Sequence, residues 1–132
     1  MRQVFRLLAV VAGLIGAACT GDSTSGPVDS STLILELSTP HTDDGAVLFE
    51  LRGPTIDTVV AVNASLLLFT RRAGDGTMVG ALVGPVANGA IAIVRVSNPG
   101  AASAYSPRIV EVADRQKTLR GELTGYGLSV IR

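Results

Sequence analysis

The only histidine of the chain, His41, lies close to a pair of adjacent carboxylates, Asp43 and Asp44. A serine hydrolase needs a histidine within hydrogen-bonding reach of an acid and of a serine, for which Ser38 and Ser65 are available. Neither serine lies in the G-x-S-x-G pattern of a nucleophile elbow. We therefore expect a solvated loop histidine and no enzyme, with a small hydrolase that uses His41 as a further alternative.

Carboxylates next to glycine in HTDDG and AGDG are the candidate metal ligands. Calcium accepts carboxylate oxygens, so calcium bound at Asp43, Asp44 or Asp75 is one alternative, although neither segment has the alternating acids of an EF-hand loop. The other alternative is that turns themselves require Asp and Gly. Catalytic zinc usually needs three ligands from His, Cys and carboxylates. With one His and one Cys in the chain, we expect no metal site of that kind and no resident cofactor.

Aromatic side chains are scarce, which bears on sugar binding. Carbohydrate modules often place a sugar on an exposed ring, and the chain has no Trp, two Tyr and three Phe. Phe49 and Phe69 lie among aliphatic residues and are predicted to be core. Tyr105 and Tyr126 remain as candidate surface contacts, and Tyr126 is equally consistent with a structural tyrosine that bonds a nearby turn. A carbohydrate-binding module is therefore the alternative function and not the leading one.

The single cysteine, Cys19, follows a leader with the composition of a signal peptide. A short basic segment, 1–6, precedes twelve uncharged residues, 7–18, which are too few for the roughly 20 that span a bilayer. The segment after Cys19 is polar and offers no apolar surface on which a buried thiol would pack. We predict a signal peptide over 1–18.

The junction LLAVVAGLIGAAC resembles the lipobox of bacterial lipoprotein precursors. The resemblance implies that Cys19 is acylated and becomes the new N-terminus, so that the protein is exported and its partner is the membrane. Because Thr20 and not Asp follows, it also implies an outer-membrane lipoprotein that faces the periplasm or the cell surface. Gly16 stands where the family usually has leucine. Secretion with cleavage near Ala18 and an uncleaved N-terminal anchor are the alternatives.

The remainder of the chain divides into a tether and one domain. Residues 19–31 comprise the cysteine and TGDSTSGPVDSS, a flexible linker with an average reach on the order of 20 Å. Two of the 11 basic residues lie in the leader, so a chain that begins at Cys19 has nine basic and 11 acidic residues, a net charge of −2. That charge does not attract polyphosphate, and we expect no nucleic-acid partner.

Short apolar runs separated by turn residues fill 32–132 and predict a single domain. The fold predicted is an all-β antiparallel sandwich of about eight strands, immunoglobulin-like or cohesin-like. Asn88 and Gly89 are predicted to close a hairpin, and 109–119 has a short helix as an alternative to a strand. Alternation places five residues in the core, namely Val47, Phe49, Leu51, Ile91 and Ile93. The expected strands are 32–37, 46–52, 55–62, 65–72, 77–84, 90–97, 106–113 and 123–131.

Two of these segments, DDGAVLFELRGPTIDTVVAV and NGAIAIVRVS, resemble strands of cohesin-like bacterial β-sandwiches, which are relatives of carbohydrate-binding modules. The resemblance implies the sandwich architecture and carries no functional residue. Val94 and Arg95 stand where a cohesin usually has an aromatic. The function we expect is a non-catalytic binding or scaffolding module at the cell envelope, whose partner is an envelope protein or a glycan.

Overall fold

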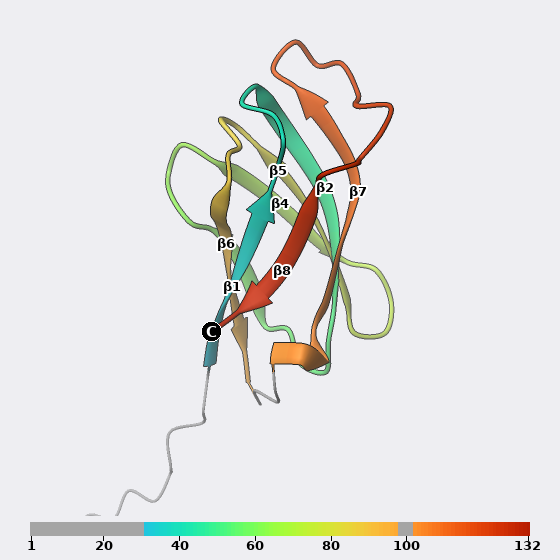
Figure 1. Ribbon diagram of the computed structural model, residues 1–132. Helices are drawn as coiled ribbons and strands as arrows, with labels where there is room; N and C mark the ends of the chain where they lie inside the picture. Colours follow the sequence, from blue (N-terminus) through green and yellow to red (C-terminus); the bar gives the residue numbers. More distant parts are fainter. Residues whose placement is uncertain (1–30, 98–101) are drawn as a thin grey trace, which may run out of the picture.

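The computed structural model describes residues 31–97 and 102–132, and in this part of the chain eight strands form two antiparallel sheets (Figure 1). The all-β sandwich of about eight strands is thereby confirmed. The leader, Cys19 and the rest of the tether before Ser31 lie outside the described residues. The strands are β1 (Ser31–Ser38), β2 (Asp44–Arg52), β3 (Thr58–Ala61), β4 (Leu67–Arg72), β5 (Thr77–Val83), β6 (Gly89–Val96), β7 (Ser106–Asp114) and β8 (Gly127–Ile131), with one 3-10 turn, η1 (Ala102–Ala104), before β7.

One sheet has the strand order β3-β6-β1-β8 and is called the β1 sheet, and the other has the order β4-β5-β2-β7 and is called the β2 sheet. Within the described residues only β4 and β5 are both consecutive and paired. Their turn contains Gly74 and Gly76, both at positive φ, a conformation that glycine adopts without strain. The remaining connections between described strands pass from one sheet to the other. Most strand pairs therefore join segments far apart in the sequence.

The predicted hairpin at Asn88 and Gly89 is wrong, because β5 and β6 belong to different sheets. Residues 84–88 instead cross between the sheets. Val86 is fully buried in this crossing, and the Asn88 side chain accepts a hydrogen bond of 2.7 Å from the backbone N–H of Thr39. A turn sequence typical of hairpins therefore serves here as a crossover, fixed by contacts with distant residues.

The core lies between the sheets and is almost entirely aliphatic. Its largest fully buried side chain is Phe49, whose ring lies against Gly80 on the paired strand. A β-carbon at Gly80 would fall 2.3 Å from the Phe49 ring, so the aromatic occupies the space that any larger residue would need. Val47, Leu51 and Ile91 are buried as predicted.

Ile93 is half-buried and faces outward, so its prediction as a core residue is wrong. The pairing of β1 with β6 shifts between Leu35 and Glu36, and this bulge leaves Ile91 and Ala92 both buried. One extra residue in a strand reverses the face of every residue that follows it. The alternative of a helix over 109–119 is also not adopted, because β7 continues to Asp114.

Candidate functional site

A buried carboxylate, Asp44, is the centre of a polar cluster at one end of the sandwich. It begins β2 and is fully buried. One oxygen accepts a 2.5 Å hydrogen bond from the Thr39 hydroxyl, and the other accepts a 2.8 Å bond from the Tyr126 hydroxyl. Arg120 donates to the second oxygen as well, at 3.0 Å from Nη2 and 3.2 Å from Nε. Asp44 is therefore satisfied by two chain segments, the β1–β2 loop with Thr39 and the β7–β8 connection with Arg120 and Tyr126.

Arg120 also donates to Asp43, over 2.6 Å. Its guanidinium thus binds two adjacent carboxylates, Asp43 just before β2 and Asp44 at the start of β2. The backbone reinforces this junction, since the N–H of Arg115 donates to the Asp43 carbonyl and the N–H of Arg120 to the Val112 carbonyl. The cluster fastens the long connection between β7 and β8 to the sandwich.

The electrostatics of the cluster favour the charged forms of Asp44 and Arg120 and the neutral form of Tyr126. Burial alone would raise the pKa of the Asp44 carboxyl, but the hydrogen bonds it accepts and the charge of Arg120 outweigh burial and lower that pKa. The hydrogen bond to Asp43 raises the pKa of the Arg120 guanidinium. Burial, together with the neighbouring Asp44 carboxylate, raises the pKa of the Tyr126 phenol. At neutral pH the Asp44 carboxylate and the Arg120 guanidinium are therefore charged, and the Tyr126 phenol is neutral.

The structure does not bring the three candidate calcium ligands together. Asp43 and Asp44 both bind Arg120, whereas Asp75 lies in the β4–β5 turn at the opposite end of the sandwich, beyond the far end of β2. Across residues 31–97 and 102–132, no three His, Cys, Asp or Glu side chains form a group that could hold a metal ion.

His41 is exposed in the β1–β2 loop. Its ring lies 5.8 Å from the ring of Tyr126, centroid to centroid. No hydrogen bond in the described part of the chain joins the imidazole to Ser38 or Ser65, and the Ser65 hydroxyl donates to Asn63 instead. In the described residues neither candidate serine is therefore hydrogen-bonded to His41.

Two tyrosines were candidates for surface contacts. The prediction is wrong for Tyr105, because this residue is only 4% exposed. Its ring covers Gly53, where a β-carbon would fall 2.1 Å from the ring. A residue without a side chain makes room for the aromatic, which is therefore part of the core. Tyr126 is half-buried, and its hydroxyl donates a hydrogen bond to Asp44 at the start of β2, so its role in the described structure is structural, although its partner is not a turn.

The outer face of the β2 sheet carries a large exposed apolar surface that the sequence analysis missed. Phe69 is 64% exposed, Leu67 60% and Val83 43%, so the prediction that Phe69 is core is wrong. The register places these side chains in two adjacent cross-strand rows with smaller apolar residues. We call this surface the apolar face; its members are Leu67, Val83 and Ala46 in one row and Phe69, Ala81 and Leu48 in the next.

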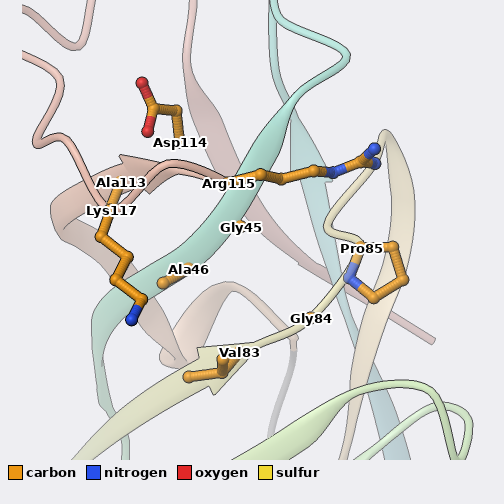
Figure 2. A pocket seen from close by; sticks show the side chains of 9 residues that line it. All are labelled: Gly45, Ala46, Val83, Gly84, Pro85, Ala113, Asp114, Arg115 and Lys117. Carbon is orange, nitrogen blue, oxygen red and sulfur yellow. The ribbon is translucent and has the colours of Figure 1, made fainter.

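The apolar face is hollowed at two places. A groove of about 550 Å³ opens at its end nearest the β7–β8 connection (Figure 2), and a smaller hollow of about 180 Å³ lies beside Phe69. Small apolar residues, chiefly glycine and alanine, make up most of the lining of the groove. It is lined by Gly45, Ala46, Val83, Gly84, Pro85, Ala113, Asp114, Arg115 and Lys117.

Cations border the apolar face at both ends. Figure 2 shows Arg115 extending toward Pro85 and Lys117 toward Ala46, while the Asp114 carboxylate is directed away and accepts bonds from two backbone N–H groups of its own turn. Arg71 lies in the row that follows Phe69. Within the described residues none of these three cations forms an ion pair. The surface can therefore hold apolar side chains with acidic groups at either end.

The described residues contain no helix with the length and hydropathy needed to cross a bilayer. Comparison of the chain with family models, with curated proteins and with solved structures finds no match.

Proposed function

We propose that this chain is a non-catalytic binding module, held at the cell envelope by a lipid on Cys19, and that it binds a protein partner through the apolar face. The observation that carries this proposal is the exposure of Phe69, Leu67 and Val83 side by side on one sheet. Contiguous exposed apolar surface is typical of interaction sites, because leaving it in water has a cost that a partner removes.

A protein partner is favoured over a glycan by the neighbours of Phe69. Its row continues with Ala81 and Leu48, and the adjacent row is Leu67, Val83 and Ala46. A sugar needs hydrogen-bonding groups around the ring on which it stacks, and these two rows supply none. Thr70 and Arg71 are the polar residues in the hollow beside Phe69. Aromatic and aliphatic side chains at the centre with charges at the rim are typical of protein interfaces.

The charge of the rim indicates the chemistry of the partner. Arg71, Arg115 and Lys117 border the apolar face without ion pairs in the described chain, whereas Arg108 is already paired with Glu50 at 2.9 Å. Opposite charge across an interface speeds association and selects the partner. We expect the partner to place acidic residues opposite the two ends of the apolar face and not opposite Glu111, which lies beside Leu48 at the β7 edge.

The non-catalytic part of the proposal is supported by the arrangement of the polar groups. Asp44, Arg120 and Tyr126 bond one another, and their mutual bonds fix a loop connection. His41 lacks a hydrogen bond to a nucleophile in the described chain. A reacting centre would need such groups to face a substrate.

Phe69→Ser is expected to abolish capture of the partner when intact cells are crosslinked and the chain is purified with whatever is bound to it. Removing a central aromatic contact typically costs at least about 2 kcal/mol, or roughly 30-fold in affinity. The matched control is Val60→Ser, because Val60 is 45% exposed on the outer face of the opposite sheet. If Phe69→Ser captures as much partner as Val60→Ser does, the apolar face is not the binding site. Loss of polysaccharide binding in Phe69→Ser alone would instead support a carbohydrate-binding module.

Cys19→Ser is expected to move the protein from the membrane fraction to a soluble or uncleaved form. The change removes the sulfur that would carry the lipid, and a chain without acyl groups loses its hold on the bilayer. Fractionation and the intact mass of the purified protein measure the result. A variant that stays with membranes at the mature size would show that the lipid anchor is wrong.

A further inference from the structure

A row of branched apolar side chains crosses the outer face of the β1 sheet. The register pairs Val60 with Ile93, Ile93 with Ile34, and Ile34 with Ile131, so the row spans all four strands. Val60 is 45% exposed and Ile131 38%, and the two central residues are half-buried. We call these four residues the transverse row. It lies on the opposite side of the sandwich from the apolar face.

The surroundings of the transverse row carry little charge. The next row toward the start of β1 consists of Thr58, Arg95 and Thr32. On the other side Glu36 pairs with Ser129. Arg95 is exposed and forms no ion pair in the described chain. The face therefore combines an apolar band, hydroxyl groups, the Glu36 carboxylate and, near the end where β1 begins, the unpaired cation Arg95.

The position of the tether relates this face to the membrane. β1 begins at Ser31, and Ile34 follows three residues later, which is about 10 Å along a strand. The tether predicted over 20–31 has an average reach on the order of 20 Å. A lipid on Cys19 would therefore hold the transverse row within reach of the bilayer surface. β8 ends beside the same stretch of β1, which brings Ile131 to the same level.

We infer that the anchored domain rests on its own leaflet through the outer face of the β1 sheet, with the transverse row at the headgroup boundary and Arg95 at lipid phosphates. This inference rests on the lipid anchor of the proposed function. The tether that the sequence predicts would give the face an effective concentration in the millimolar range, so that a contact too weak to bind a free protein is sufficient here. The apolar face then points away from the membrane, toward a partner.

The absence of tryptophan from the chain allows a direct test. The full lipid-bearing protein is reconstituted into vesicles of phosphatidylethanolamine and phosphatidylglycerol whose acyl chains are brominated, which quench nearby tryptophan. Val60→Trp is compared with Phe69→Trp, because both positions are exposed and lie on opposite sheets. We expect loss of emission and a blue shift for Val60→Trp and neither change for Phe69→Trp. Ile131→Trp gives a second probe of the row if Val60→Trp does not fold.

Each other outcome contradicts the inference in a different way. If the protein does not float with the vesicles, the anchor is wrong and the orientation is wrong with it. If it floats but Phe69→Trp is quenched as much as Val60→Trp, or neither is quenched, the anchor stands and the orientation is wrong. A blue shift of Val60→Trp without quenching would assign the row to a protein contact, such as a second copy of the chain. Arg95→Glu in the Val60→Trp background should reduce the quenching in vesicles that contain phosphatidylglycerol.

Discussion

Arg120→Met is expected to lower the free energy of unfolding by clearly more than the roughly 0–1 kcal/mol of an exposed ion pair, because it leaves a buried carboxylate without its cation. Asp44 is fully buried, and Arg120 supplies its only ion pair in the described chain. Methionine keeps much of the apolar length of arginine, so the loss reports the charge and its hydrogen bonds more than the packing. Urea unfolding followed by circular dichroism measures the difference.

Arg108→Met is the matched control for this prediction. Its pair with Glu50 is 2.9 Å long, close to the 3.0 Å of the pair between Arg120 and Asp44, but the side chain of Arg108 is 67% exposed. Exposed pairs contribute about 0–1 kcal/mol because water and salt screen them. If the two variants lose stability equally, the cluster around Asp44 does not hold the β7–β8 connection as described.

The pH dependence gives the same prediction a second measurement. Because the pKa of Asp44 is lowered in the folded protein, its contribution to stability is present above the ordinary aspartate pKa of about 3.9 and is lost as the pH falls through the folded value. In Arg120→Met only Thr39 and Tyr126 remain to oppose the effect of burial on the pKa of Asp44. Protonation of Asp44 at low pH therefore relieves part of the cost of burying its charge in this variant. The stability difference between the variant and the wild type should therefore be largest at neutral pH and narrow below about pH 4.

The strands were predictable because turn residues interrupt apolar runs at short intervals along the chain. All eight predicted segments overlap an observed strand. The order of strands in the sheets was not predictable, because alternation shows which residues share a face and does not show which strands pair. The Asn88–Gly89 turn illustrates this point. Burial of Val86 and the bond to Thr39, 49 residues away, make it a crossover, and neither contact is visible in the local sequence.

The candidate sites were less predictable than the fold, for two physical reasons. The run SLLLFTRR lacks an alternating polar residue between Leu66 and Phe69, so its sequence does not show that Leu66 faces inward while Phe69 faces outward. The partner of Asp44 is 76 residues distant in the sequence. Asp43 and Asp44, next to a glycine, were therefore candidate metal ligands in the sequence. In the fold both carboxylates are bound by the guanidinium of Arg120.

Phe49→Ala is expected to lower the free energy of unfolding by about 3–5 kcal/mol, as large-to-small changes at fully buried aromatics do. The ring is fully buried and lies against Gly80, where no side chain can move in to fill the space. Ile93→Ala is the control, since Ile93 also lies on a central stretch of strand but faces outward and is half-buried. Its loss should be much smaller, because solvent already reaches the site and little cavity forms. Urea unfolding of both variants distinguishes the two faces, and a larger loss for Ile93→Ala would show that the bulge beside Ile91 does not reverse the strand.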